Sequence, residues 1–160
     1  MTAFDAAAFR TTLSRFTTGV VVVTAPGPVG MVVSSFTSVS LDPPLVLFCA
    51  GNESTTWPRI RDSGQFCANV LAAGQEPIAR QFAGPGNRYR GIGYQRGPHG
   101  GLLLDGVHAY VDCEIAGEYP GGDHTIVVGR VRQLDIGRDT VPLVFHRSRF
   151  HDGTVLNATG

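Results

Sequence analysis

The strongest constraint on the fold of this sequence is a series of short apolar, β-branched segments separated by glycine and proline turns. Such segments occupy residues 19–25, 29–41, 44–51, 66–72, 109–119, 124–136 and 142–151. The chain contains 21 Gly and 10 Pro, a surplus over average composition that fits many tight turns. Runs of this kind bounded by turn residues are typical of antiparallel strands. The sequence therefore predicts a mainly β protein, an antiparallel barrel of about six strands with a few short helices.

Three stretches have helical features instead. Residues 5–18 place Phe9, Leu13 and Phe16 on one helical face, with Asp5 as a cap and Gly19 as the end. Two shorter helices are expected in 54–64 and 74–84, each with a proline near its start. Between these elements, residues 84–106 form the most glycine-rich stretch, which predicts a long loop of the kind that often borders a site.

The balance of charge limits the kinds of partner. Thirteen arginines stand against thirteen acidic residues, so the formal net charge is zero, and there is no lysine. Zero net charge argues against a protein that binds nucleic acid or anionic lipid through its overall charge. An oligonucleotide-binding barrel would show a basic face studded with aromatic side chains, and here the arginines are scattered. With no repeat and no polar linker, residues 1–160 are expected to form a single domain.

The cellular compartment is expected to be the cytoplasm. No apolar run approaches the roughly 20 residues that a membrane-spanning helix needs, and the first residues do not resemble a signal peptide. Cys49, Cys67 and Cys113 are odd in number and lie among apolar neighbours. They are expected to be buried as free thiols in a reducing compartment.

Short catalytic motifs are absent from the sequence. It contains no GxGxxG after a strand, no GxxxxGK[ST], no HExxH, no CxxC and no GxSxG, and the histidines have no spacing typical of a metal site. The most distinctive stretch is instead GMVVSSFTSVSLDPPLVLF, residues 30–48, where hydroxyl side chains crowd one predicted strand. Hydroxyls and free backbone N–H groups at a strand end can face the polar rim of a planar heterocycle. A Ser/Thr-rich edge strand explains the same residues.

Read in order, the segments resemble the flavin reductase-like family. The resemblance rests on FRTTLSRFTTGVVVVTA, GMVVSSFTSVSLDPPLVLF, NESTTW, FCANVLA, IARQFAG, YPGGDHTIVVGRV and PLVFHRSRF. It extends from about residue 9 to residue 151 and is closest to the NAD(P)H:flavin oxidoreductases of two-component monooxygenases. Each segment alone is weak, but the ordered set is specific.

This resemblance implies both a fold and a reaction. The fold is the FMN-binding split barrel, a six-stranded Greek-key barrel, in a homodimer with flavin near the dimer interface. The activity is that of an oxidoreductase in which NADH or NADPH reduces FMN or FAD, and the reduced flavin passes to a separate monooxygenase. The cofactor carries the redox chemistry, so a catalytic dyad is not required. The alternative is a split-barrel protein that binds flavin or haem without turnover.

The resemblance also implies the positions of the flavin contacts. The flavin ring is expected near Ser34, Ser35, Phe36, Thr37 and Ser40, although packing explains Phe36 equally well. The phosphate side of the flavin is expected near Ser54, Thr55, Thr56, Arg80, Phe82 and Ala83. Helix capping is the plain alternative for the three hydroxyls, as is core packing for Phe82. A solvent-facing position on the helix is the plain alternative for Arg80.

The family's histidine on the nicotinamide side of the flavin corresponds to His124 in the GGDHT turn. An imidazole there can orient the nicotinamide carboxamide, whereas an exposed turn histidine is the plain alternative. The neighbouring Asp123 is expected to bond turn N–H groups. Near the end of the chain, strand alternation predicts that His146 and Arg147 face opposite sides. On that alternation either Phe150 reaches the flavin pocket, or two arginines, Arg147 and Arg149, meet a nucleotide phosphate. Arg88 and Arg90 are further candidates for NAD(P)H phosphates.

Overall fold

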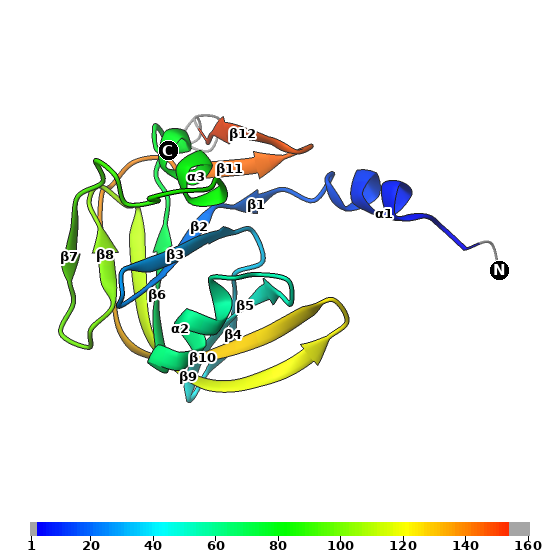
Figure 1. The fold of residues 1–160 in the computed structure, drawn as a ribbon. Coiled ribbons are helices and arrows are strands. Elements are labelled where there is room, and N and C mark those ends of the chain that lie inside the picture. The colour runs from blue at the N-terminus through cyan, green and yellow to red at the C-terminus, as the bar shows by residue number, and fades with distance from the viewer. Residues whose placement is uncertain (1–2, 154–160) are drawn as a thin grey trace.

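The computed structural model describes residues 3–153, in which strands predominate and only three helices occur (Figure 1). The helices are α1 (Ala6–Leu13), α2 (Trp57–Ser63) and α3 (Glu76–Ala83). The strands are β1 (Thr18–Gly19), β2 (Val21–Ala25), β3 (Val29–Val33), β4 (Thr37–Leu41), β5 (Pro44–Gly51), β6 (Gln65–Val70), β7 (Tyr94–Arg96), β8 (Leu102–Leu104), β9 (Ala109–Gly121), β10 (His124–Ile136), β11 (Leu143–His146) and β12 (Arg149–Asp152). The predicted class, mainly β with a few short helices, is confirmed.

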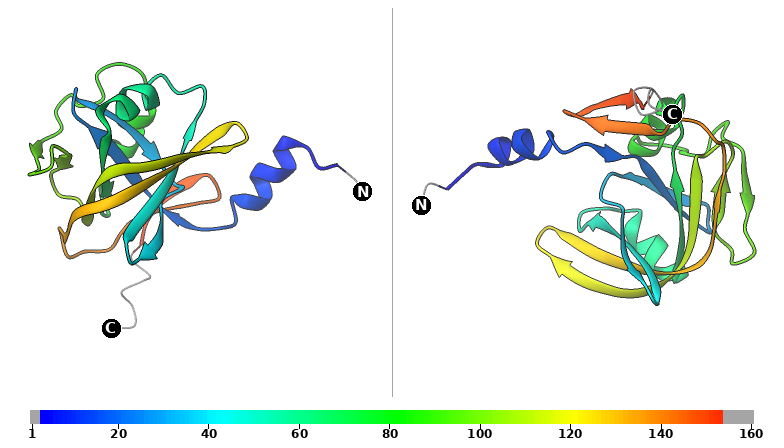
Figure 2. Two further views of the ribbon diagram at one scale, coloured as in Figure 1. Left: turned by 90° about the horizontal axis from the view of Figure 1, so that it is seen from below. Right: turned by 180° about the vertical axis from the view of Figure 1, so that it is seen from behind.

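A seven-stranded sheet forms the body of the molecule, in the order β3-β2-β6-β9-β10-β5-β4. Every neighbouring pair is antiparallel. The long β9–β10 hairpin lies at its centre, and two register shifts, at Val128/Gly129 and Val131/Gln133, interrupt the pairing. Such irregularities increase local bend and twist, and the sheet curls strongly around its core (Figures 1 and 2).

The stretch 29–41 is two strands rather than the single strand predicted. β3 and β4 lie at opposite ends of the sheet order, and residues 34–36 connect them. The Ser35 hydroxyl accepts a hydrogen bond from the backbone N–H of Cys49 (2.9 Å) and lies 3.4 Å from its carbonyl. A side chain thus replaces strand pairing at this point. In the described residues the two outer strands are not paired with each other, so the sheet has seven strands and two ends rather than six strands in a closed barrel.

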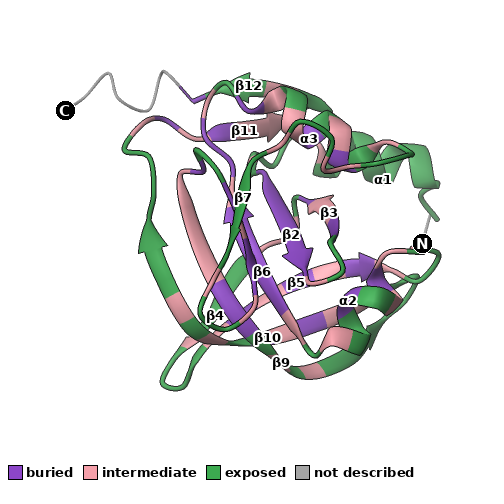
Figure 3. Ribbon diagram, turned by 60° about the vertical axis from the view of Figure 1, so that its left-hand side comes forward, coloured by how far each residue is buried: buried purple, intermediate pink, exposed green. Residues whose placement is uncertain are grey.

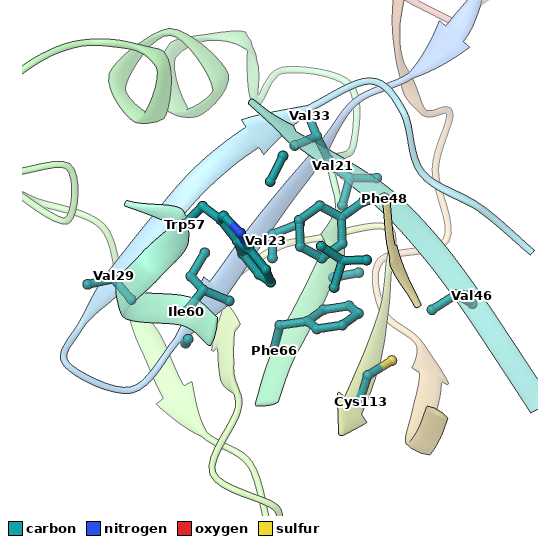
Figure 4. Packing of buried hydrophobic residues seen from close by; sticks show 14 residues of the cluster. Val21, Val23, Val29, Val33, Val46, Phe48, Trp57, Ile60, Phe66 and Cys113 are labelled. Carbon is teal, nitrogen blue, oxygen red and sulfur yellow. The ribbon is translucent and has the colours of Figure 1, made fainter. Parts of the chain in front are cut away.

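Two hydrophobic cores lie on opposite faces of β2, and successive residues from Val20 onward alternate between them. Val21 and Val23 belong to the core inside the curled sheet, together with Phe48, Trp57 and Phe66 (Figure 4). Val20 and Val22 face a second core that includes residues of α3 and β8. Both faces of β2 are therefore buried, as the burial colours show (Figure 3), which explains its uninterrupted apolar sequence.

Helix α1 stands away from the body of the molecule (Figures 1 and 2). It is shorter than the predicted 5–18, and Asp5 caps it by accepting from the Ala8 N–H at 2.7 Å. No residue of α1 is buried. The predicted apolar face exists, but Phe9 and Phe16 are 51% and 73% exposed. The chain's own core does not cover this face, because the helix projects beyond it.

The predicted loop 84–106 contains a short hairpin of β7 and β8. Buried polar side chains attach it to the sheet. Thr24 donates to the Leu102 carbonyl (2.6 Å), while Asn69 donates to the same carbonyl (3.1 Å) and accepts from the Leu104 N–H (2.9 Å). Backbone groups of β8 are satisfied in this way although β8 does not join the main sheet.

Candidate functional site

The largest cavity described here is polar and lies where three segments meet. It measures about 550 Å³ and is lined by residues 28–30, 55–56, 59 and 85–89. These residues come from the β2–β3 turn, from the start of the α2 region and from the loop after α3. We call it the Arg88 cavity. None of its lining residues is acidic, so it favours an anionic ligand.

Arg88 is held rigidly in this cavity. Its Nε donates to the Gly84 carbonyl (3.0 Å), and its Nη1 donates to the Gly30 carbonyl (2.8 Å) and to Thr56 Oγ1 (3.0 Å). Among the described residues, Nη2 has no partner and remains available. A planar guanidinium fixed in this way is a suitable donor for a phosphate.

The wall behind Arg88 is tightly packed. A Cβ at Gly30 would lie 2.5 Å from a ring carbon of Phe82, so only glycine leaves this wall in place. The Tyr89 hydroxyl donates to the Val29 carbonyl at 2.7 Å, and burial raises the pKa of Tyr89 far above its usual value. Phe82 is 1% exposed and contacts Tyr89 edge-on. Phe82 is therefore part of the core that supports the cavity.

The three predicted phosphate hydroxyls have different surroundings. Ser54 Oγ accepts from the N–H groups of Thr56 (3.2 Å) and Trp57 (3.1 Å), which caps the start of α2. Thr56 accepts from Arg88, and Thr55 is exposed and lines the cavity. Ser54 thus acts as the cap, which is the plain interpretation, while Thr55 and Thr56 line the cavity and their role as phosphate contacts stays a prediction.

The predicted hydroxyl row on 34–40 is dispersed. Ser35 joins the backbone of β5, and Phe36 packs against the main core. Thr37 is exposed and Ser40 is half-buried, both on β4. Ser34 is exposed and lines a different, smaller pocket. The break between β3 and β4 separates these side chains, which the single-strand prediction had placed together.

The smaller pocket is apolar and measures about 140 Å³. Its lining side chains are Val20, Val32, Val33, Ser34, Phe145 and Phe150. The Arg80 guanidinium lies 5.3 Å from the centre of the Phe150 ring and donates two hydrogen bonds, of 2.9 and 2.7 Å, to Glu76. Arg80 does not line the Arg88 cavity, and Ala83 is exposed at the end of α3.

His124 begins β10 beside the end of β5. Its Nδ1 lies 2.7 Å from Asp123 Oδ1, and its Nε2 faces Gly51, where a Cβ would be 3.9 Å away. The pKa of Asp123 is lowered, first by the hydrogen bond with His124 and then by the charge of that ring, with Arg10 of α1 adding to the effect. The Asp123 carboxylate bonds the neighbouring ring, and its own backbone N–H in the turn also helps to lower its pKa. It orients the imidazole and leaves Nε2 available.

A third cavity lies at the β11–β12 hairpin. His146, Arg147, Arg149 and His151 line it, and its volume is about 480 Å³. The prediction that His146 and Arg147 face opposite sides is wrong. Arg147 and Ser148 have φ of 49° and 61° and form the turn, so strand alternation stops before Arg147. Thr17 Oγ1 bonds His146 Nδ1 at 2.9 Å.

Sequence reasoning missed Arg59 and Gly30 in the Arg88 cavity. Arg59 follows Thr56 by three residues, a spacing that places both on one side of a helical turn, so the helix predicted over 54–64 contained the signal. Gly30 had no such signal, because its importance comes from a contact with Phe82, which is distant in sequence. Arg90 is exposed and does not line the cavity.

No group of three or more His, Cys, Asp or Glu side chains is arranged to hold a metal ion within residues 3–153. Within the same range, none of the helices combines the length and the apolar character required to traverse a lipid bilayer.

Comparisons with known proteins give consistent results. The family model described as the flavin reductase like domain matches residues 13–154. A flavin reductase of Pseudomonas putida is 40% identical over 153 residues, covering 92% of this chain and 90% of that protein. The reductase subunit HsaB of a flavin-dependent monooxygenase from Rhodococcus jostii is 40% identical over 152 residues, covering 92% of this chain and 78% of that protein.

Solved structures show the same likeness. The NADH:FAD oxidoreductase SgcE6 of Streptomyces globisporus, in complex with NAD and FAD fragments, superposes with a TM-score of 0.88 at 38% identity. The superposition covers 92% of each chain.

Proposed function

The chain belongs to the flavin reductase-like domain family, and we propose that it is an NAD(P)H-dependent flavin reductase that supplies reduced flavin to a separate monooxygenase. The observation that carries this proposal is the match over residues 13–154, because it includes every cavity-forming segment described above. A flavin reductase and the reductase subunit of a flavin-dependent monooxygenase each match about nine-tenths of the chain. The enzyme is accordingly an oxidoreductase.

The residues present fit a flavin nucleotide, either FMN or FAD. Arg88 and the hydroxyls of Thr55 and Thr56 offer donors for the phosphate side. The apolar pocket with Phe150 and Ser34 lies at the other end of β3 and suits the ring system. When bound there, flavin supplies the chemistry: it accepts a hydride, which carries two electrons, from the nicotinamide ring of NADH or NADPH. Ser35, Phe36, Thr37, Ser40, Ser54, Arg80, Phe82 and Ala83 remain predicted flavin contacts.

The protein's own contribution is to orient the hydride donor. We assign His124 Nε2 to the nicotinamide carboxamide, with Asp123 holding the other ring nitrogen. Arg147 and Arg149, in the hairpin cavity, are placed to bind the donor's phosphates, because two cations and two histidines face one cavity.

We also infer that the curled sheet is the family's FMN-binding split barrel and that the whole of residues 1–160 functions as one domain in a homodimer. Support for the homodimer comes from α1, which projects from the body with Phe9 and Phe16 uncovered. An isolated helix of eight residues is marginal in water, so its order requires a covering surface. The free thiols of Cys49, Cys67 and Cys113 fit a reducing compartment such as the cytoplasm.

The test is direct. Purified protein is mixed with NADH or NADPH and with FMN or FAD, and the nicotinamide absorbance is followed over time. We expect rapid oxidation in at least one of the four combinations. A folded sample that binds flavin but oxidises neither donor would contradict the proposed activity and support the non-catalytic alternative.

A further inference from the structure

We propose that the Arg88 cavity binds the adenosine diphosphate half of FAD, and that Arg59 makes the enzyme prefer FAD over FMN. This inference rests on the proposed function. It goes beyond that function because it names which flavin the site selects and which side chain selects it.

The size of the Arg88 cavity is the first argument. FMN ends in a single phosphate, whereas FAD continues through a second phosphate to a ribose and an adenine. The cavity measures about 550 Å³, within the range of roughly 300–1,000 Å³ that holds drug-sized ligands. It extends from the Thr55–Thr56 turn to Pro28 and Pro85. The space beyond the first phosphate is therefore large enough for a nucleoside.

The charges of the cavity are the second argument. The Nε and Nη1 of Arg88 donate hydrogen bonds to protein oxygens, so only its Nη2 is available to bind a ligand. Arg59 lines the same cavity, and its guanidinium makes no hydrogen bond or ion pair with any residue of 3–153. One of its terminal nitrogens lies close to the β2–β3 turn, 3.7 Å from where a Cβ at Gly27 would be. Arg59 thus extends from α2 toward the turn, and the cavity offers one fixed and one unpaired cation to two adjacent phosphates.

The remaining walls suit a base and a ribose. Pro28, Pro85 and Gly86 line this part of the cavity and carry no side chain that donates or accepts hydrogen bonds. Asn87 Oδ1 accepts from the Tyr89 N–H at 3.1 Å, which fixes the amide with its NH₂ group as a free donor.

NADH contains the same adenosine diphosphate group, so the two sources must be separated. We assign the cavity to FAD because its wall includes Thr55 and Thr56, the hydroxyls of the flavin phosphate side, and because the hairpin cavity already offers Arg147 and Arg149 to the nicotinamide nucleotide.

The experiment measures equilibrium binding of FAD, FMN and ADP by flavin fluorescence and calorimetry, for the wild-type protein and for Arg59→Gln. Arg61→Gln is the matched control, since Arg61 lies on the same helix, outside the cavity, and pairs with Asp62. We expect the wild type to bind FAD more tightly than FMN and ADP to compete with FAD. In Arg59→Gln the Kd for FAD should rise about tenfold, with the Kd for FMN unchanged and Arg61→Gln behaving as wild type.

Three results would overturn the inference. The first is equal affinity of the wild type for the two flavins, and the second is an equal loss for both flavins in Arg59→Gln. The third is a KM for NADH, measured with FMN as acceptor, that rises in Arg59→Gln while the Kd for FAD stays constant. Normal turnover alongside any of these leaves the flavin reductase assignment intact. Absence of turnover in every donor and flavin combination, in folded protein, removes the assignment itself and the inference with it.

Discussion

At His124 the protein uses a neighbouring carboxylate to orient an exposed imidazole. Asp123 holds Nδ1 at 2.7 Å, so the ring presents Nε2 although about half of the side chain is accessible to solvent. Pre-orientation of this kind lowers the entropic cost of binding a ligand. A histidine without the carboxylate would sample several rotamers, and its contribution to positioning a nicotinamide would be smaller.

We expect His124→Ala to raise the KM for NADH about five- to tenfold, the cost of one lost hydrogen bond, and to leave the Kd for flavin unchanged. Asp123→Asn should give a smaller effect in the same direction, because the ring remains but loses its charged partner. Steady-state kinetics and flavin fluorescence measure the two quantities. An unchanged KM and kcat in His124→Ala would remove the assigned role.

Asp112 is a second single residue whose surroundings change its properties, here by burial of a carboxylate. It is 1% exposed, and in residues 3–153 neither carboxylate oxygen makes a well-formed hydrogen bond, although the backbone N–H groups of Gly101 and Cys113 lie close enough to lower its pKa slightly. A Cβ at Gly101 would lie 2.8 Å from its Cγ, so the 97–101 turn covers it closely. Burial raises the pKa of Asp112, and the charge of His99 partly opposes this effect. The folded state therefore binds this proton more tightly than the unfolded state does.

A raised pKa in the folded state gives stability that is complete below the unfolded pKa of about 3.9 and is lost as pH rises through the folded value. We expect Asp112→Asn to increase the free energy of unfolding by about 1–3 kcal/mol near neutral pH, with the gain shrinking toward about pH 4. Urea unfolding across this range measures it. The exposed Asp62→Asn is the control, and a gain that does not depend on pH would contradict the explanation.

At the scale of elements, hydrophobic pattern predicted which segments form strands but not where one strand ends. Residues 29–41 have a continuous strand-like pattern, and the break at 34–36 follows from the curl of the sheet, a property of all seven strands. The end of β11 at the Arg147 turn could not be predicted from hydrophobic pattern either. A turn with positive φ at two residues other than glycine has no clear sequence signal.

For α1, the sequence pattern predicted the helix correctly but did not predict what surrounds its apolar face. Its apolar face was predicted at Phe9, Leu13 and Phe16, and the helix is present, yet these side chains are at least half exposed. The spacing of apolar residues indicates that a helix has an apolar face to bury, but it does not indicate whether the same chain or another chain buries it. The same reasoning applies to the candidate site: Thr55, Thr56 and His124 could be predicted from local sequence patterns, whereas the close contact of Gly30 with Phe82 joins residues that are distant in sequence.

If α1 forms the interface of the proposed homodimer, Phe9→Asp should convert the dimer to monomer at micromolar concentration, because it places a charge on the apolar face of α1. Thr11→Asp is the matched control, since residue 11 lies on the opposite side of the helix. Light scattering coupled to size-exclusion chromatography gives the mass of each variant. A wild type that is monomeric, or a Phe9→Asp variant that remains dimeric, would remove α1 from the interface.

At the scale of the whole molecule, the three cavities lie at the margins of the sheet, while its centre is packed with apolar side chains. The candidate sites thus lie largely on loops and hairpins that the sheet holds in place. The proposed homodimer would add to the stability of the fold, because a partner that binds only the folded chain stabilises it by mass action.

The Tm of the wild type should therefore rise with protein concentration, while that of Phe9→Asp should not. Calorimetry over a hundredfold range of concentration distinguishes the two. A Tm independent of concentration in the wild type would indicate that assembly does not contribute to stability.

Strand β2 has one further consequence. Because its alternate residues belong to the two cores, neither core can open while the other stays closed. Slow fluctuations are then confined to parts outside both cores, such as α1 and the β9–β10 and β11–β12 tips, and the backbone amides of β2 exchange with solvent only when the entire chain unfolds. Ligands can enter and leave at the periphery through such local motions, without any loss of the protein's global integrity.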